Sequence, residues 1–498
     1  MAEIETKLEP IKSYPSSKRR LILGAAWTVG TRWAIKGIGF LNTIIMARLI
    51  LPSDYGIVAM AMLVVGLIEA LMDFGATTAL LRKNEVTRDE IDSAWTLRWL
   101  QSIGMGLILL AAAPLAASYF EEPRVEYVLW IMAASVAIAG AGNIGFVLAQ
   151  KEFNFSLEFR IQIIGKIAGV VATVISGYLL RDYRALVIGI TTGYMSGLIL
   201  SYVMHPYRPR WNTSKFGEIW VVTKWLMLAG VGGFILRKSD ELIAARIGTT
   251  SDYGLYSVGA DLGQLPTGEV GPAMLRVFMP VLVAMRGSVD EINAAVVKTV
   301  GAINTITLPI GLGFAAVATP ACNLILGPTW SGAAQYVAAF ALVGTAQIIQ
   351  SPFRTLLTIR GHTKVQSNAV WMEFAVFLAA SAALVPHLFL MGLVWARLLG
   401  SLVNLAVIFL AARKYCGISA SATAMALLRP LTGAALMYLA VQAAVGQVDG
   451  DALKLGLGIV CGAVTYMVWS LSSWWMVGRP EGLELTILDY IRELCRIK

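Results

Sequence analysis

The sequence predicts an all-α polytopic membrane protein built from two similar bundles of helices. Three observations carry this prediction: hydrophobic residues make up 57% of the 498 residues, charged residues make up only 14%, and one short motif occurs twice. A soluble protein of this length has roughly a quarter charged residues. The apolar residues also fall into blocks of about 20, the length that a helix needs to cross a bilayer core about 30 Å thick.

The apolar blocks predict about 14 transmembrane helices, with both termini cytoplasmic. The expected spans are 21–50, 55–81, 95–118, 126–149, 160–180, 185–204, 219–247, 253–280, 291–318, 332–353, 366–385, 388–411, 424–446 and 454–476. In this topology the cytoplasmic loops hold roughly 22 Lys and Arg residues and the exterior loops about four, as the positive-inside rule describes. The net charge of +9 therefore indicates orientation in a membrane and gives no reason to expect a nucleic-acid partner.

The motif that occurs twice is ARLILPSDYG at 47–56, which returns as ARIGTTSDYG at 245–254. Six predicted spans separate the two copies, so both lie on the exterior side in the same orientation. We therefore expect two parallel six-helix lobes related by a pseudo-twofold axis along the membrane normal.

The residues shared by the two copies predict a tight corner between helices. Ser53 and Ser251 are natural N-caps for the helix that follows. Gly56 and Gly254 allow neighbouring helices to pack closely, because they carry no side chain.

The repeat also predicts the domain organisation. The expected parts are a cytoplasmic tail (1–20), a first lobe (21–204), a cytoplasmic linker (205–218), a second lobe (219–413), two additional spans (414–476) and a cytoplasmic amphipathic helix (477–498). That last helix either lies on the membrane surface or packs as a soluble helix against the protein.

Ionisable residues inside the predicted spans are the candidate functional residues, because each costs about 2.5–3.5 kcal/mol at mid-bilayer. Arg32 and Lys36 lie one turn apart on the first span, on a stripe continued by Thr28, Gly39 and Thr43. Such a stripe indicates a water-filled cavity that accepts an anion such as a pyrophosphate. The alternative is a buried ion pair with an acidic helix.

In the second lobe, Arg237 and Arg397 are the candidates for substrate contact. The alternative for each arginine is an ion pair with a nearby carboxylate, which would be a structural role. Glu241 lies one turn after Arg237, and Glu373 lies near the middle of the span before Arg397, so either pair can neutralise itself.

Glu69 and Asp73 on the second span have two interpretations. They pair with the cations of the first span, or they take up H⁺ or Na⁺ and couple transport to an ion gradient. Three further cations lie near the cytoplasmic starts of their helices: Arg98, Lys166 and Lys298. Their side chains can extend to the membrane surface, which removes most of the free-energy cost of placing a charge in the bilayer. A role at a cytoplasmic gate is a minor hypothesis for these residues.

No motif predicts covalent chemistry. His205, His362 and His387 are too separated to form a metal site, and the four cysteines have no metal-ligand spacing. The GAGNIG segment at 140–145 lies inside a span rather than after a strand, so it does not predict nucleotide binding. We expect no catalytic residue, no metal, no cofactor and no enzyme activity.

Three segments together resemble the Wzx-type polysaccharide flippases of the multidrug/oligosaccharidyl-lipid/polysaccharide exporter superfamily. They are ARLILPSDYG at 47–56, AQKEFNF at 149–155 and KSDELIAARIGTTSDYGLY at 238–256. The resemblance covers about residues 20–413 and rests on the order and spacing of the segments.

The resemblance implies a flippase that moves undecaprenyl-pyrophosphate-linked oligosaccharide repeat units across the bacterial inner membrane by alternating access. Such units serve exopolysaccharide, capsule or O-antigen assembly. The implied partners are the lipid-linked substrate, membrane lipids and a polysaccharide polymerase or export machinery. A multidrug/cation antiporter of the same superfamily is the alternative, although its cavity would be acidic or aromatic rather than cationic.

The resemblance also bears on individual residues of the first span. With Ala47 and Arg48 as the anchor, Lys36 falls where the related lipid II flippase has a cavity arginine. Asn42 falls where that relative has another arginine, so this second cation is missing here.

Overall fold

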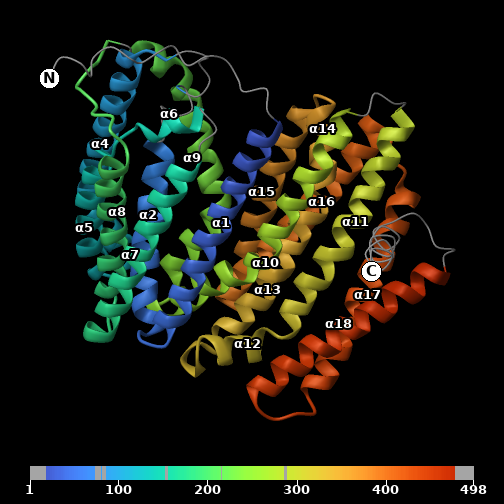
Figure 1. Cartoon of the computed structure of the whole chain (residues 1–498). Coiled ribbons are helices and arrows are strands. Elements are labelled where there is room, and N and C mark those ends of the chain that lie inside the picture. The colour runs from blue at the N-terminus through green and yellow to red at the C-terminus, as the bar shows by residue number, and fades with distance from the viewer. Residues whose placement is uncertain are drawn as a thin grey trace, which may run out of the picture. The chain divides into compact units, whose positions relative to one another are not determined.

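Most of the described residues are helical, and these residues are 18–72, 80, 86–151, 155–214, 216–284 and 289–476 of the computed structural model (Figure 1). Ten helices in this part are long and apolar enough to cross a membrane by length and composition. Every predicted span overlaps at least one helix. The prediction of an all-α polytopic membrane protein is therefore confirmed.

Some of the sequence predictions fall outside the described residues. These are the first 17 residues of the cytoplasmic tail, the amphipathic helix at 477–498 and Asp73 on the second span. The lobe boundaries predicted from the repeat stay a prediction. By its own contacts the chain divides into two compact units, Met1–Gly254 and Leu255–Lys498.

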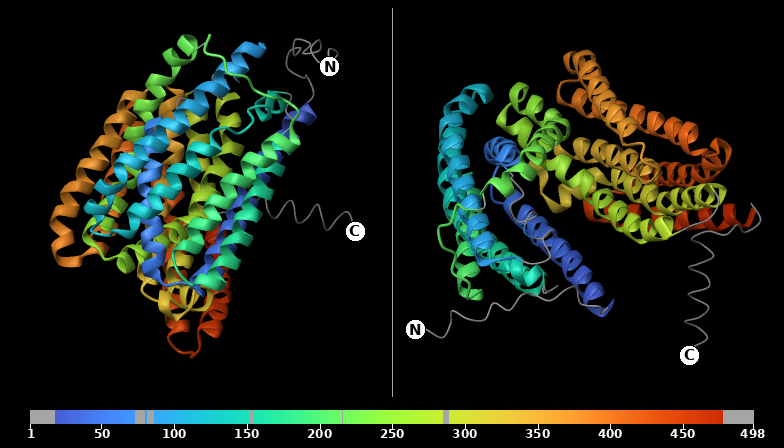
Figure 2. Two further views of the ribbon diagram at one scale, coloured as in Figure 1. Left: turned by 90° about the vertical axis from the view of Figure 1, so that its left-hand side faces the viewer. Right: turned by 90° about the horizontal axis from the view of Figure 1, so that it is seen from above.

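The first unit holds eight helices within its described residues. They are α1 (Lys18–Ala47), α2 (Pro52–Met72), α4 (Arg88–Phe120), α5 (Arg124–Ala139), α6 (Phe146–Lys151), α7 (Ser156–Leu180), α8 (Arg184–Met204) and α9 (Phe216–Ile247). Two pairs of neighbours along the chain, α4 with α5 and α7 with α8, pack as hairpins. Helix α7 runs beside α8, α4 beside α5, α1 beside α7 and α2 beside α9 (Figure 2). The unit ends in the first turns of α10 (Thr250–Ala284).

The second unit holds the rest of α10 and a further run of helices. These are α11 (Val289–Ala316), α12 (Ala318–Ile325), the 3₁₀ turn η1 (Pro328–Trp330), α13 (Ala333–Ile349), α14 (Ser351–Ile359), α15 (Thr363–Leu388), α16 (Leu390–Cys416), α17 (Ala420–Val445) and α18 (Asp451–Met476). Helix α15 packs on α16, while α17 packs on both α11 and α18. One buried cluster, which includes Phe353, Leu357 and Ile408, joins α14, α16 and the start of α11.

The two copies of the repeated motif meet at their glycines. A Cβ atom added at Gly56 would overlap the carbonyl oxygen of Thr250, and one added at Gly254 would overlap the carbonyl oxygen of Pro52. The contact is reciprocal: each glycine touches the backbone at the start of the other copy's helix. Because no side chain fits at either position, close packing requires glycine at both, as predicted.

The capping role predicted for the two serines is wrong. Helix α2 begins at Pro52 and α10 at Thr250, one residue before each serine, so Ser53 and Ser251 lie inside the first turn. In the second copy the cap is Thr249. Its Oγ1 accepts a hydrogen bond from the Asp252 N–H at 3.2 Å, and the Asp252 carboxylate accepts one from the Thr249 N–H at 3.1 Å. This reciprocal pair is a capping box.

Candidate functional site

The candidate site in the first unit is the polar stripe of α1. The side chains of Arg32 and Lys36 are both exposed in the structure, although they lie within a helix that matches the first predicted span. Thr43, farther along the stripe, donates its hydroxyl to the Gly39 carbonyl at 3.2 Å and so satisfies itself within the helix. An exposed charge inside a transmembrane helix faces water more favourably than lipid. The stripe is therefore a cationic surface, and the water-filled cavity stays a prediction.

Lys166 of α7 lies beside this stripe. Its Cε and Nζ atoms are 3.8 and 3.9 Å from the position that a Cβ atom would take at Gly39. Lys166 is half-buried, and it makes no hydrogen bond or ion pair with another residue of the described ranges. The sequence predicted Lys166 as a gate residue. That role stays a prediction, but the structure adds the contact with α1.

The other two residues predicted at a cytoplasmic gate have different surroundings. The guanidinium carbon of Arg98 lies 5.9 Å from the centre of the Phe146 ring, a cation–π distance. In the described part of the chain Arg98 has no ion pair with a carboxylate. Lys298 is exposed on α11. The gate role of all three residues stays a prediction.

Glu69, the described member of the predicted ion-coupling pair, is exposed near the end of α2. Its carboxylate is close enough to Tyr194 of α8 to interact with it electrostatically. Neither a pairing with α1 nor an ion-coupling role is tested by this position, so both interpretations of Glu69 stay open.

On α9, the Glu241 carboxylate forms an ion pair with Lys238, one turn before it. Its second oxygen accepts a hydrogen bond from the buried Tyr253 hydroxyl at 3.4 Å. The sequence prediction considered Arg237 as the partner of Glu241 and did not consider Lys238. Arg237 itself is exposed.

In the second unit, Glu373 of α15 is the centre of a polar network. Ser401 of α16 donates its hydroxyl to Oε1 at 3.2 Å, and the Asn404 amide donates to Oε2. The Nη2 atom of Arg354, on α14, lies 3.8 Å from Oε2. Arg397, which the sequence offered as the partner, instead places its guanidinium carbon 5.7 Å from the centre of the Phe377 ring. The charge that faces Glu373 is thus Arg354.

Sequence reasoning missed Arg354 because it lies one residue beyond the predicted end of the span 332–353. It therefore counted as a loop residue. In the structure the chain continues as α14, and Arg354 is half-buried there, with Nε donating to the Gln350 side chain at 3.3 Å. An arginine directly after an apolar block was the available signal.

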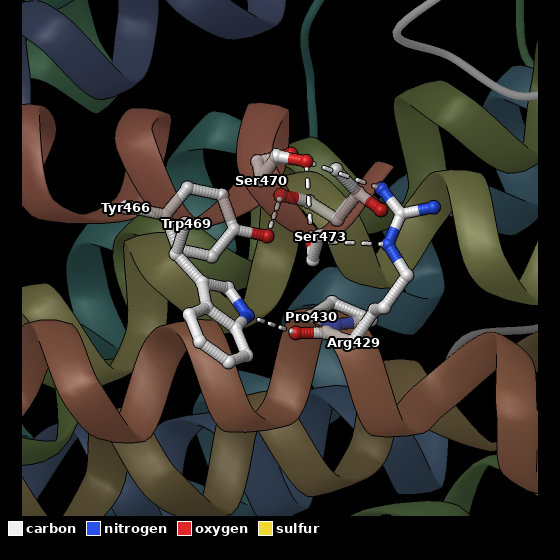
Figure 3. A pocket seen from close by; sticks show the side chains of 7 residues that line it. Arg429, Pro430, Tyr466, Trp469, Ser470 and Ser473 are labelled. Carbon is white, nitrogen blue, oxygen red and sulfur yellow. Dashed lines mark hydrogen bonds between the residues drawn. The ribbon is translucent and has the colours of Figure 1, made fainter. Parts of the chain in front are cut away.

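A second missed cation, Arg429, lies in α17 and lines a small pocket against α18 (Figure 3). Its Nε donates to the Ser473 hydroxyl at 3.3 Å, and its Nη2 donates to the Ser470 carbonyl at 3.5 Å. The Trp469 indole in turn donates to the Arg429 carbonyl at 3.2 Å. Tyr466, also in the pocket, donates its hydroxyl to the Thr305 carbonyl at 2.8 Å. These bonds join α17 and α18 to α11, which is a structural role.

A third polar cluster attaches the segment after α8 to the start of α4. The buried Asp92 carboxylate accepts a hydrogen bond from the Tyr207 hydroxyl at 2.6 Å and another from the Arg210 N–H at 3.0 Å. Burial, together with the hydrogen bond to Asp92, raises the pKa of the Tyr207 phenol. The indole ring of Trp99 in α4 also stacks on that of Trp211 in the segment after α8, with ring centres 5.3 Å apart. The first part of the predicted linker is therefore held on the first unit.

Comparison with solved structures shows the fold. The chain is similar to the lipid II flippase MurJ in an inward closed conformation, with a TM-score of 0.72 and 12% identity over 92% of this chain and 99% of that one. It is also similar to an inward-facing multidrug resistance MATE family transporter, with a TM-score of 0.59 and 13% identity over 76% of this chain and 94% of that one. At such low identity these likenesses concern the fold alone.

Curated relatives share less than a quarter of their residues with this chain but match most of its length. An uncharacterized membrane protein in the cps region of Klebsiella pneumoniae is 22% identical over 73% of this chain and 76% of its own length. The lipopolysaccharide biosynthesis protein WzxC of Escherichia coli (strain K12) is 22% identical over 70% and 72%. The succinoglycan biosynthesis transport protein ExoT of Rhizobium meliloti (strain 1021) is 22% identical over 64% of both chains.

The family described as polysaccharide biosynthesis protein matches residues 45–335, more than half of the chain. That range begins just before the first copy of the repeated motif and includes the second. The resemblance drawn from the motifs is thereby confirmed, and the chain belongs to the polysaccharide biosynthesis protein family.

Proposed function

We propose that this chain is a flippase that moves undecaprenyl-pyrophosphate-linked oligosaccharide repeat units across the bacterial inner membrane. The units would serve exopolysaccharide, capsule or O-antigen assembly, and both termini would be cytoplasmic. The observation that carries the proposal is the exposed pair Arg32 and Lys36 on α1, inside a chain of this family. Relatives named for lipopolysaccharide biosynthesis and succinoglycan transport support the substrate class.

Such a protein must move the polar head of the substrate across the membrane without exposing it to the hydrocarbon core. A pyrophosphate and several sugars carry many polar groups, and each group buried without a partner costs several kcal/mol. A water-filled cavity with positive side chains removes this cost for the head, while the polyprenyl tail stays in lipid. Arginine grips a phosphate with two hydrogen bonds, and lysine attracts it as a point charge.

Translocation then requires the cavity to open to each side of the membrane in turn. A duplicated bundle with parallel repeats suits this requirement, because one half can rock against the other around a central site. Arg237 and Arg397 are the proposed contacts from the second half. Glu69 and Asp73 are the proposed site of coupling to H⁺ or Na⁺. No covalent step and no cofactor is part of the proposal, and a polysaccharide polymerase is the proposed partner.

The test is to delete the gene and follow the lipid-linked repeat units. We expect these units to accumulate on the inner leaflet and surface polysaccharide to fall, and a plasmid copy of the wild-type gene to restore both. Unchanged surface polysaccharide in the deletion strain, with no accumulation of lipid-linked units, would contradict the proposal.

A drug/cation antiporter is the second candidate. The likeness to a multidrug resistance transporter, with a TM-score of 0.59, and the exposed Glu69 carboxylate favour it. The exposed cations of α1 weigh against it, because they would repel a cationic drug. The same deletion strain distinguishes the two: altered drug sensitivity with normal polysaccharide would favour the antiporter.

A further inference from the structure

Four cations gather at one end of the second unit, where α14 ends, α15 begins and α16 ends. They are Arg360, Lys364, Arg413 and Lys414, and together they are called the basic patch. All four side chains are exposed. Helices α15 and α16 pack on each other as a hairpin, so the start of α15 and the end of α16 lie at the same end of the unit. The basic patch is therefore assembled from two separate segments of the chain.

Specific contacts hold the two segments of the basic patch together. The imidazole ring of His362 lies 4.8 Å from the Tyr415 ring, centre to centre, and joins the turn before α15 to the last turn of α16. A buried cluster that includes Leu357 and Cys416 joins α14 to α16. Arg360 is close enough to Cys416 to interact with it electrostatically. The fold thus keeps the four charges near one another.

The charges of the basic patch are not compensated by neighbouring carboxylates. Among the described residues, none of the four cations forms an ion pair. Cations at helix ends of the first unit differ in this respect. The Nε atom of Arg124 lies 2.8 Å from a carboxylate oxygen of Glu122. The Nη1 atom of Arg246 lies 2.7 Å from a carboxylate oxygen of Glu121. Like charges held close together repel one another, so the basic patch favours a partner that carries negative charge.

Exposed apolar side chains lie next to the basic patch along both helices. On α15, Trp371 is 56% exposed and lies two turns after Lys364 on the same helix face. On α16, Leu410 is 57% exposed and lies one turn before Lys414. The Nζ atom of Lys414 lies 5.3 Å from the centre of the exposed Tyr415 ring. Cations followed by aromatic and aliphatic side chains match the order of headgroup and hydrocarbon at a bilayer surface.

We infer that the basic patch binds the headgroups of anionic phospholipids in the adjacent membrane leaflet. The positive-inside rule explains on which side of a membrane cations remain, but it does not supply the negative charge that four unpaired cations favour. The exposed apolar side chains beside them suit acyl chains, which a free phosphate or a soluble acidic protein does not have. The inference goes beyond the proposed function, because it holds whichever substrate the protein moves.

The experiment measures lipid binding to the purified full-length protein in detergent by native mass spectrometry. The probes are phosphatidylglycerol and phosphatidylcholine with identical acyl chains, so they differ only in the headgroup, which is anionic in the first and zwitterionic in the second. We expect the wild type to bind phosphatidylglycerol more tightly. The double variant Lys364→Gln/Lys414→Gln should lower this preference about 25-fold, which is about fivefold for each cation removed.

Three controls separate an effect of charge from an effect on structure. The variant Lys364→Arg/Lys414→Arg keeps both charges and should retain the preference. Lys454→Gln removes a cation from the first turn of α18, which α17 places at the other end of the unit, and should leave the preference unchanged. Without added lipid, the unfolding temperature of Lys364→Gln/Lys414→Gln should not fall below that of the wild type, because two mutually repelling charges are removed.

The outcomes that overturn the inference are distinct from a failure of the flippase proposal. Equal binding of the two lipids by the wild type overturns it, and so does a full preference for phosphatidylglycerol in Lys364→Gln/Lys414→Gln. If that variant keeps its lipid preference but loses surface polysaccharide, the basic patch binds an acidic protein partner instead. An equal loss of both lipids also overturns the inference, because it indicates a structural effect. The flippase proposal is tested separately, by the deletion strain.

Discussion

Charges inside the helices are compensated differently in two regions of this protein. On α1 and α7, Arg32 and Lys36 are exposed, and Lys166 has no ion pair or hydrogen bond within the described residues. Around α15, by contrast, Glu373 is bonded by Ser401 and Asn404 and faced by Arg354. The α1 charges are thus exposed at the surface of their helix, whereas the Glu373 carboxylate is surrounded by side chains that bond to it or face it. Substitutions in the first region should therefore change transport, and those in the second should change stability.

The largest effect is expected at Lys36. Lys36→Ala should abolish surface polysaccharide while the protein still inserts, because the cavity loses a charge that attracts the substrate head, and Lys36→Arg should retain part of the export. The measurement is surface polysaccharide in a deletion strain that carries each variant, with membrane protein quantified alongside. Arg160→Ala, an exposed cation on α7, is the control. If well-expressed Lys36→Ala and Lys36→Glu proteins exported normally, the proposed role of Lys36 in the cavity would be contradicted.

Glu373 should show the opposite pattern. Glu373→Ala leaves Arg354 and Asn404 without their shared partner, so we expect a loss of about 1–3 kcal/mol of stability, below the cost for a fully buried pair because Arg354 is partly exposed. A lower unfolding temperature in detergent should accompany export that stays near the wild-type level at matched protein amount. Asp449→Ala, in an exposed turn, supplies the control. If Glu373→Ala left the unfolding temperature unchanged but abolished export, Glu373 would have a transport role and the proposed difference between the two regions would be wrong.

The smallest effect is expected at Tyr207, the partner of Asp92. It tests whether a charged residue contributes to stability because it has bonded partners, whichever unit it lies in. Asp92 lies in the same unit as Lys36 but is bonded by Tyr207 and Arg210. Tyr207→Phe should cost about 1.5 kcal/mol of stability, the lower end of the range for a hydrogen bond to a charged group, without changing export. Lost export at an unchanged unfolding temperature would show that the paired cluster has a transport role.

The pH dependence of that variant follows from the raised pKa of the Tyr207 phenol. The unfolded phenol ionises near pH 10, whereas the folded phenol stays protonated to higher pH. The stabilising contribution is thus fully present below about pH 10 and decreases as pH rises above it. The difference in unfolding temperature between wild type and Tyr207→Phe should shrink in the same direction. A constant difference from pH 8 to pH 11 would contradict this assignment.

The helices were predictable because their signal is local. A block of about 20 apolar residues is visible in the chain itself, and each predicted span overlaps a helix of the structure. Close packing at Gly56 and Gly254 was also predictable, because two copies of SDYG at equivalent corners indicated a shared packing role, whereas the contact between the two copies was not. The starts of those helices were misjudged by two residues, since Thr249 with Asp252 forms a cap as good as Ser251 would.

The partners of the charges were not predictable, because they depend on which helices touch. Glu373 has Arg397 on the next span and Arg354 just beyond an earlier one, and nothing in the sequence decides between them. The contact between Lys166 and Gly39 joins residues 127 positions apart, and a glycine gives no sign of what occupies the space above it. Spacing along one helix identified Arg32 and Lys36; it had no means to add a cation from another.

The reciprocal glycine contact limits which substitutions the repeated motif accepts. Gly56 and Gly254 each rest on the main chain of the opposite copy, so a side chain at either position is accommodated only if that main chain moves. Each copy of the motif therefore restrains the sequence of the other. A variant that exchanges one copy for the corresponding segment of a relative must keep a glycine at this crossing.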